Sequence, residues 1–244
     1  MTDVSIPKRA MVIVAHPDDA EFTMAGTVAI WARAGCTVCY VICTRGDRGS
    51  NDPHMAPWEL ARIRGREQRA AAAILGVQEV VLLDYPDGTL EPTLSLRRDL
   101  TREIRRFRPE AVLCGDPTVR FYGDGYLNHP DHRAAASAAL DAVFPSAETR
   151  YVFPELLAAG FEPHRVSAVY IHGSLEPNVW IDIQTVLEIK ARALAAHVSQ
   201  IGDGPALKWV QEMAREEGRK QGMEAAEAYR RMVINGSEGE EDDG

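Results

Sequence analysis

The stretch "AMVIVAHPDDAE" (residues 10–21) decides the fold, because it joins an apolar run to a turn crowded with ionisable groups. Six apolar residues precede one histidine and three acids. A short, uninterrupted apolar run is typical of a strand that is buried on both faces of a parallel sheet. We therefore expect the turn at residues 16–19 to lie at the carboxyl end of the first strand.

Similar apolar runs recur along the chain, and helical patterns separate them. The expected strands cover residues 10–15, 37–44, 79–84, 110–115 and 167–172, and the expected helices cover about 21–34, 58–75, 95–107, 131–143 and 185–197. This alternation predicts an α/β fold with a doubly wound, mostly parallel sheet flanked by helices, a Rossmann-like α/β/α arrangement of three layers. In such folds ligands bind beyond the carboxyl ends of the strands. The loops that follow the strands, at 45–57, 85–94 and 115–131, should therefore gather on one rim with the turn at 16–19.

The rest of the chain is expected to be simple in organisation. No linker divides it, so residues 1–236 are predicted to form a single domain. Within that domain, segment 201–234 is interpreted as one or two charged helices packed on the outside. Residues 237–244 contain five acids and no apolar residue that could join a core, which predicts a disordered acidic tail.

Charge and hydropathy exclude two classes of partner. The 27 basic and 36 acidic residues give a formal net charge of −9, and leaving out the five acids of the tail gives −9 + 5 = −4. A weakly acidic body offers no basic field for nucleic acid. No segment has the apolar length that a membrane span requires. We expect a small-molecule ligand, with neither nucleic acid nor membrane as a partner.

The four cysteines give no metal site. Cys36 and Cys39 form a CxxC pair, but a second pair is missing and both residues lie in the apolar run at 37–44 or directly before it. They are interpreted as small core residues rather than zinc ligands. Reduced thiols, together with an N-terminus that lacks the layout of a signal peptide, predict a cytoplasmic protein.

One phrase occurs twice, as "HPDD" at 16–19 and as "HPDH" at 129–132. Each copy places potential metal ligands three residues apart. In each, the proline can occupy the first position of a helix, where its missing N–H costs nothing, so the turn is held stiffly. A single His-x-x-Asp is more often a turn and helix cap than a metal site. Two such turns on one rim are hard to explain as independent caps, and they favour a metal centre.

The two turns supply a set of ligands and a set of catalytic groups. His16, Asp19 and His132 form a two-histidine, one-carboxylate set that suits zinc and leaves one position open for water, although Fe²⁺ could replace zinc. Asp18 would stand beside the metal as a general base. His129 would stabilise an oxyanion or protonate a leaving amine, and Asp131 would hold the ring of His129 in its cationic form.

At these residues the sequence resembles the LmbE-like, or PIG-L, family of zinc-dependent N-acetylglucosaminyl deacetylases. The likeness extends through "TRGDRGS" (44–50), "ELARIRGREQRAAAAILG" (59–76), "YPDGTL" (85–90), "NHPDHRAA" (128–135) and "KARALAAHVSQ" (190–200). The resemblance implies the same roles for His16, Asp18, Asp19, His129 and His132. It also implies that Arg64 and Asp87 reach the substrate. The alternatives are a solvated helix arginine and a residue that merely forms a Pro-Asp-Gly turn.

The resulting hypothesis is a metal-dependent hydrolase that removes the N-acetyl group from a substrate containing N-acetylglucosamine. Zinc would activate a water molecule, Asp18 would act as the base and His129 as the acid. One alternative is an amidase that acts on amino-sugar thiol conjugates, and another is a non-catalytic sugar-binding relative. A dinucleotide is disfavoured because no GxGxxG follows the first strand. We also expect a homo-oligomer, since small α/β hydrolases often associate.

Overall fold

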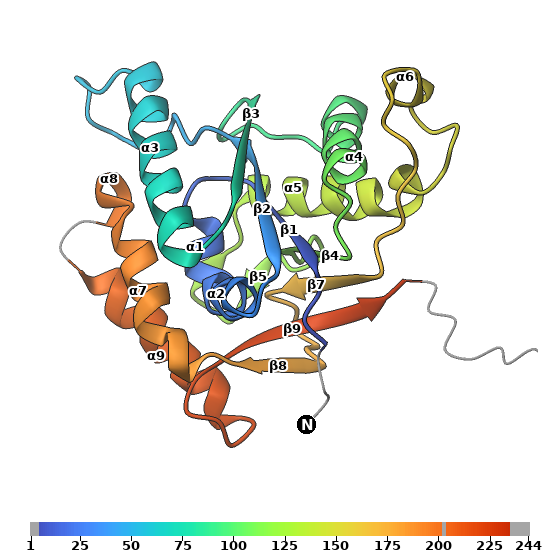
Figure 1. Ribbon diagram of the computed structural model, residues 1–244. Coiled ribbons are helices and arrows are strands. Elements are labelled where there is room, and N and C mark those ends of the chain that lie inside the picture. Colours follow the sequence, from blue (N-terminus) through green and yellow to red (C-terminus); the bar gives the residue numbers. More distant parts are fainter. Residues whose placement is uncertain (1–4, 202–203, 235–244) are drawn as a thin grey trace, which may run out of the picture.

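The structure, a computed structural model, describes residues 5–201 and 204–234 and is built on a central sheet. In the described part seven strands pair in the order β3-β2-β1-β4-β7-β9-β8 (Figure 1). The five expected strands form and pair in parallel: β1 (Arg9–Val14), β2 (Thr37–Thr44), β3 (Glu79–Tyr85), β4 (Ala111–Gly115) and β7 (Ala168–His172). The predicted doubly wound, mostly parallel sheet is confirmed.

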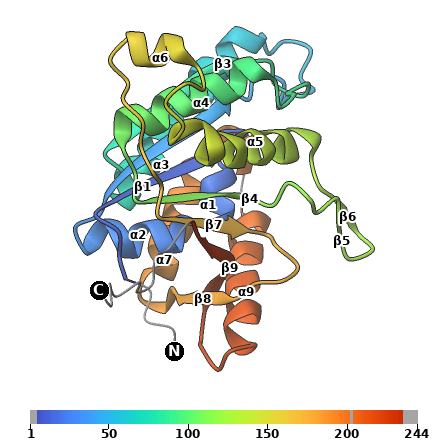
Figure 2. The same cartoon turned by 90° about the vertical axis from the view of Figure 1, so that its right-hand side faces the viewer.

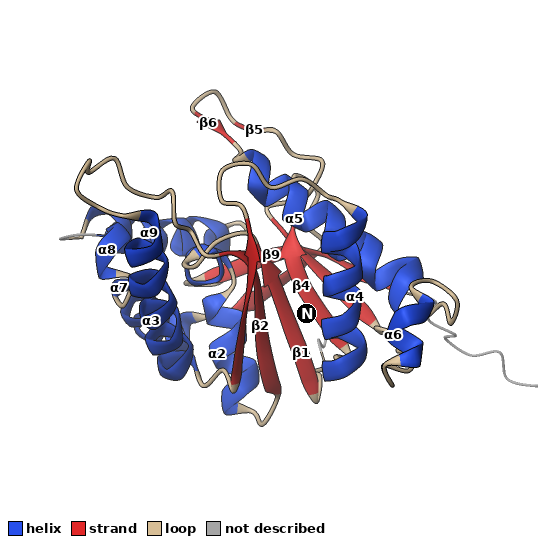
Figure 3. Ribbon diagram, turned by 90° about the horizontal axis from the view of Figure 1, so that it is seen from above, coloured by secondary structure: helices blue, strands red, loops and turns tan. Residues whose placement is uncertain are grey.

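Helices cover both faces of the sheet because side chains along each central strand alternate between two apolar cores. Val12 of β1 points into one core, and Met11 and Ile13 point into the other. One layer of helices contains α1 (Asp19–Thr23), α2 (Ala25–Arg33), α3 (Pro57–Leu75), α7 (Leu187–Ala195), α8 (Val198–Ile201) and α9 (Pro205–Arg219), with the short turn η2 (Gln184–Val186) before α7. The opposite layer contains α4 (Leu94–Phe107), α5 (Pro130–Asp141), η1 (Ala142–Ala147) and α6 (Pro154–Ala158) (Figure 3).

The sequence-based interpretation of segment 201–234 is wrong in its second half. Of the residues described in this segment, Ile201 ends α8 and Pro205–Arg219 form α9, whereas β9 (Ala226–Val233) is a strand that lies inside the sheet. It runs antiparallel to β7 on one side and to β8 (Val179–Asp182) on the other. The strand was not predicted because it contains two arginines and a glutamate, and a glutamate is expected in a buried strand only where a cation pairs with it. Glu227 has that partner, since its Oε1 lies 2.5 Å from Nζ of Lys190.

Two further expectations are refined by the structure. The helix expected at 21–34 is interrupted at Met24, where φ is −125° and ψ is 0°, so that α1 and α2 are separate. The expected acidic tail at 237–244 lies outside the described residues, so it stays a prediction, as does the domain boundary at 236. None of the described helices combines the length and the apolar composition that crossing a bilayer would require.

The topology places the two His-Pro-Asp turns at the point where the strand order reverses. β1 and β4 are neighbours, and the chain builds the sheet outward from them in opposite directions. The loop after β1 carries residues 16–19, and the loop after β4 leads to residues 129–132. In between, β5 (Phe121–Tyr122) and β6 (Tyr126–Leu127) form a hairpin that projects from the body (Figure 2). Open α/β sheets bind ligands beyond the carboxyl ends of their strands at such a reversal of strand order.

Candidate functional site

The first turn is held by the carboxylate of Asp19. One of its oxygens, Oδ2, accepts hydrogen bonds from the backbone N–H of Ala15 at 3.1 Å and of His16 at 2.8 Å. Asp18 occupies the N-cap position of α1 without a side-chain capping hydrogen bond, and its φ of +92° lies in the left-handed region that non-glycine residues rarely adopt. Pro17 precedes this cap instead of opening the helix, so its expected helical position is wrong for this turn.

The second turn opens α5, and here the proline does take the first helical position. Nδ1 of His129 accepts a hydrogen bond from the backbone N–H of Asp131 at 3.1 Å, which caps the helix. One helical turn later His132 projects from the same end of α5. Its Nδ1 lies 3.2 Å from Oδ1 of Asn128, whose own amide nitrogen donates to the carbonyl of Val119 at 2.8 Å. The second turn is therefore as firmly held as the first.

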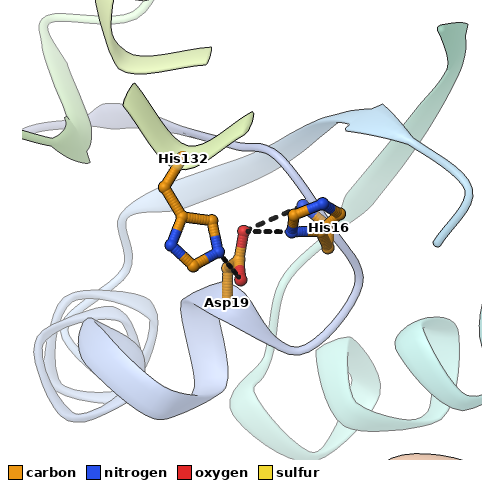
Figure 4. Close-up of side chains that lie close together, drawn as sticks. All are labelled: His16, Asp19 and His132. Atoms are coloured by element: carbon orange, nitrogen blue, oxygen red, sulfur yellow. Dashed lines mark hydrogen bonds and ion pairs between the residues drawn. The ribbon is translucent and has the colours of Figure 1, made fainter. Parts of the chain in front are cut away.

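The structure brings the predicted ligands together (Figure 4). Nε2 of His132 lies 3.1 Å from Oδ1 of Asp19, and Nδ1 of His16 lies 3.5 Å from Oδ2 of the same carboxylate. One ligand atom from each of the three residues falls within 4.8 Å of the other two. The ring of His129 stands beside them, 4.9 Å from the ring centre of His16 and 5.3 Å from that of His132.

In both candidate histidine ligands, the outer ring nitrogen, which points away from Asp19, faces a hydrogen-bond acceptor. Nε2 of His16 lies 3.1 Å from Oδ1 of Asp87 and 3.3 Å from Oδ2 of Asp131, while Nδ1 of His132 faces the amide oxygen of Asn128. A proton on each outer nitrogen leaves the inner nitrogen with a free lone pair. Carboxylate or carbonyl acceptors behind the imidazoles are the usual support of histidine metal ligands. The donor set therefore fits a divalent cation.

The charge balance of the site points the same way. Burial alone would lower the pKa of His16, but the charge of Asp19 and the hydrogen bonds to Asp131, Asp19 and Asp87 raise the pKa of His16 to about 12. In the metal-free site the protonated ring thus supplies the positive charge that three carboxylates require. A cation would replace that charge, and its binding would release the proton.

The main side-chain partner of Asp131 is not the one expected. We expected its carboxylate to hold His129, but that contact is long, with Oδ1 at 3.8 Å from Nδ1 of His129. The carboxylate is fully buried and accepts hydrogen bonds from the backbone N–H of Gly88 at 2.7 Å and of Leu90 at 3.2 Å, in addition to its contact with His16. Asp131 therefore supports the His16 ring, and it touches His129 chiefly through its backbone amide.

Arg64 is not the solvated helix arginine that was considered as the alternative, and a contact with substrate stays a prediction. Only 4% of the residue is exposed. Its guanidinium donates to the carbonyl of Pro17 at 2.6 Å, to that of Gly46 at 2.9 Å and to Oδ2 of Asp18 at 3.1 Å. A Cβ atom at Gly46 would overlap its Nη1, and one at Gly49 would lie 2.6 Å from the same atom, so the glycines of the loop after β2 make room for the guanidinium.

Asp87 is likewise buried. Its Oδ2 accepts from the backbone N–H of Arg48 at 2.7 Å, and its Oδ1 contacts His16 as described. Burial opposes its ionisation, but the hydrogen bonds from His16 and from the Arg48 backbone lower the pKa of Asp87 to about 2. Both of its oxygens are engaged by protein groups, and it holds a candidate ligand in place.

Two supporting residues were missed by the sequence analysis. Gln68 accepts from the backbone N–H of Asp18 at 3.0 Å, and Asn128 faces the ring of His132. The sequence offered a signal in both cases. Gln68 lies one helical turn after Arg64 in α3, and polar residues at that spacing share one side of the helix. Asn128 lies just before the N-cap of α5, and its signal was its position directly before the second His-Pro-Asp turn.

Comparison with known proteins places this geometry in a family. The model of the family described as PIG-L, GlcNAc-PI de-N-acetylase, matches residues 11–143. Diacetylchitobiose deacetylase of Thermococcus kodakarensis is 35% identical over 193 residues, which cover 79% of this chain and 70% of that protein. A probable N-acetyl-α-D-glucosaminyl L-malate deacetylase of Bacillus anthracis is 28% identical over 198 residues, covering 79% and 81%.

Solved structures agree with the sequence matches. The N,N′-diacetylchitobiose deacetylase from Pyrococcus horikoshii, solved in complex with its inhibitor MPG, superposes with a TM-score of 0.86 at 31% sequence identity. The match covers 93% of this chain and 84% of that one. The resemblance inferred from the two turns and the motifs around them is thereby confirmed, and the chain belongs to the PIG-L family.

Proposed function

We propose that this protein is a metal-dependent hydrolase that removes the N-acetyl group from a small substrate containing N-acetylglucosamine. The observation that carries the proposal is the convergence of His16, Asp19 and His132, with a hydrogen-bond acceptor on the far nitrogen of each imidazole. The buried carboxylate of Asp18 lies next to this set and is not one of the three candidate ligands. The named activities of the relatives, which are deacetylases of acetylated glucosamine compounds, agree with this chemistry.

His16 and His132 would hold the cation through the nitrogens that face Asp19, and Asp19 would contribute a carboxylate oxygen. Two imidazoles and one carboxylate favour zinc, and Fe²⁺ is the alternative for the same set. When bound, such a cation supplies a Lewis acid that lowers the pKa of a water in its open position and polarises a substrate carbonyl. The side chains of His132 and His129 are 32% and 42% exposed, so the open side of the site lies toward them.

Asp18 is proposed as the proton-transfer group. In the metal-free site burial raises the pKa of its carboxyl to about 7, although the charge of Arg64 opposes the rise. A carboxylate with a pKa near the working pH accepts a proton from attacking water and can return it to the departing amine. One residue can therefore serve as base in the first half of the reaction and as acid in the second.

His129 is proposed to stabilise the oxyanion of the tetrahedral intermediate. Because its Nδ1 accepts the Asp131 amide, a neutral ring carries its proton on Nε2 and can donate it in a hydrogen bond. Burial is the largest cause that lowers the pKa of His129, and it favours this neutral donor over the expected imidazolium. Asp131 and Asp87 orient His16, and Arg64 orients Asp18.

The substrate is proposed to be a small amino sugar, processed without nucleic acid or membrane, in the cytoplasm and by a homo-oligomer. The four described cysteines are free and buried, as reducing surroundings allow. Cleavage of an amino-sugar thiol conjugate would use the same groups on a different amide. A non-catalytic sugar-binding role would leave Asp18 without a task.

The test is to purify the protein, quantify its bound metal and screen acetylated substrates for release of acetate and a primary amine. The panel holds N-acetylglucosamine, its β-linked disaccharide, and its malate and inositol conjugates, with an amino-sugar thiol conjugate as the competing amide. Deacetylation that depends on bound metal supports the proposal. Metal-loaded protein that binds the sugars and cleaves no amide would refute it.

A further inference from the structure

The candidate base lies on a turn whose conformation has to be imposed. Asp18 is one of three non-glycine residues with positive φ among the described residues, and the other two are remote from the site. Arg64 holds the side chain of Asp18 and also donates to the carbonyl of Pro17, which lies in the same peptide plane as the Asp18 N–H. The backbone N–H of Asp18 is fixed by Gln68, whose Oε1 accepts from it at 3.0 Å.

The amide of Gln68 is itself held in one orientation. Its Nε2 donates to Oε1 of Glu21 at 3.1 Å, and both side chains are completely buried. A carboxylate can only accept hydrogen bonds, so it attracts the NH₂ group of the amide and directs the oxygen toward Asp18. A flipped amide would place two acceptors together and would leave the Asp18 N–H facing a donor.

His197, between α7 and α8, completes the line of contacts. Its Nε2 lies 3.2 Å from Oε2 of Glu21, and both side chains are fully buried. The other ring nitrogen, Nδ1, is buried without a partner. A bare lone pair costs less there than an unsatisfied N–H would, so the ring fits the tautomer that donates from Nε2 to Glu21. The buried line therefore runs from His197 through Glu21 and Gln68 to the Asp18 backbone.

We propose that Gln68 is a positioning residue for the base, and that Glu21 and His197 act through it by fixing the orientation of its amide. This inference rests on the proposed deacetylase function and deepens it. Gln68 does not contact the site opening or any candidate ligand. Its effect on turnover would come from holding the left-handed turn, and with it the Asp18 carboxylate, where attacking water can be deprotonated. A misplacement of about 1 Å at a reacting group can cost about 100-fold in rate.

The decisive experiment exchanges the two groups. Gln68→Met removes the acceptor at similar size, and Gln68→Glu places two carboxylates together. The double variant Gln68→Glu, Glu21→Gln restores every hydrogen bond with donor and acceptor reversed between the two positions, and it keeps the net charge. The control is Tyr229→Phe, which removes a buried hydroxyl 2.9 Å from both Thr27 and Glu227 on the same side of the sheet and touches no part of the turn.

Four quantities are measured for each protein: kcat, KM, the melting temperature, and hydrogen–deuterium exchange at the Asp18 amide in metal-free protein. For both single variants of Gln68 we expect kcat to fall at least about tenfold with KM within about twofold, and the Asp18 amide to exchange at least about tenfold faster. The double variant should return kcat and exchange to within about threefold of wild type. Tyr229→Phe should lower the melting temperature and leave kcat and Asp18 exchange unchanged.

The inference is overturned if Gln68→Met keeps wild-type kcat or wild-type exchange at Asp18. It is also overturned if a folded double variant is no better than Gln68→Glu, because the orientation of the amide would then be irrelevant. Wild-type protein that turns over no acetylated substrate overturns the proposed function instead. The exchange data identify that case, since they need neither metal nor substrate.

Discussion

Replacing Arg64 by methionine tests how the catalytic turn is held. The substitution keeps most of the side-chain length and removes three donated hydrogen bonds, to the carbonyls of Pro17 and Gly46 and to the carboxylate of Asp18. A buried carbonyl that loses its donor costs roughly 1–3 kcal/mol. A buried charge left without its partner costs roughly 3–5 kcal/mol. This last penalty is reduced here, because burial already raises the pKa of Asp18 to about 7 and the carboxyl can take up a proton.

At pH 7 we therefore expect metal-free Arg64→Met to lose about 3 kcal/mol of unfolding free energy, chiefly through the two carbonyls. The loss should depend on pH. The pKa of Asp18 is raised in the folded state, so its contribution to stability declines as pH rises through that pKa. Removing the arginine raises the pKa further, and the decline then continues to higher pH. The difference between wild type and variant should be larger at pH 9 than at pH 6.

The assay is urea denaturation at both pH values, together with kcat and KM for the metal-loaded protein. Arg62→Met serves as the control on the same helix, since its side chain is 55% exposed and its pair with Glu59 is 3.9 Å long. Such a surface change should stay within about 0.5 kcal/mol of wild type. If Arg64→Met behaves like this control, the arginine is a solvated helix residue. If it raises KM without loss of stability, the arginine contacts substrate. Either result refutes a role for Arg64 in holding the turn.

Three further outcomes follow from the contacts of the site and of strand β9. Asp18→Asn should retain bound metal and lower kcat by about 10²–10⁴-fold in acetate release, and equal turnover would remove Asp18 from the mechanism. His132→Ala should contain less bound metal than wild type by elemental analysis. Metal at about 100 times Kd stabilises a binding protein by about 2.7 kcal/mol, so excess metal should raise the melting temperature of wild type more than that of the variant. Burial opposes ionisation of Glu227, but Lys190 and Thr27 hold the pKa of that carboxyl below its usual range. The ionised Glu227 therefore contributes its full stabilisation above about pH 4.5, and this contribution is lost as pH falls. Denaturation of Glu227→Gln at pH 7 and pH 4 should therefore show a penalty that shrinks at the lower pH, and a constant penalty would contradict the assignment.

The sequence predicted the parallel half of the sheet because its strands are wholly apolar. "AMVIVA" before a turn of acids has few structural interpretations, and the recurrence of similar runs between helical patterns determined the layers. The prediction was wrong for residues 226–233, because the strand there depends on a tertiary contact. Glu227 can occupy a strand because Lys190 approaches it from α7, and nothing in the local pattern reveals that approach.

The site shows the same division between local and tertiary information. The proximity of His16, Asp19 and His132 was expected because parallel strands bring their carboxyl ends together. The tasks of the surrounding residues were not predictable in this way. Arg64 and Asp87 were assigned to substrate, which stays a prediction, and their contacts with the Asp18 turn and with His16 were not foreseen. Their partners lie 46 and 71 residues away in the sequence, and only the folded chain shows which buried groups need a donor or an acceptor.

Anomalous X-ray diffraction at the zinc absorption edge, from crystals grown with zinc, is the most direct measurement of the central claim. We expect one strong peak between the inner nitrogens of His16 and His132 and the carboxylate of Asp19, within ordinary zinc-ligand distance of all three. A peak elsewhere on the rim, or density at this position that scatters as water, would contradict it.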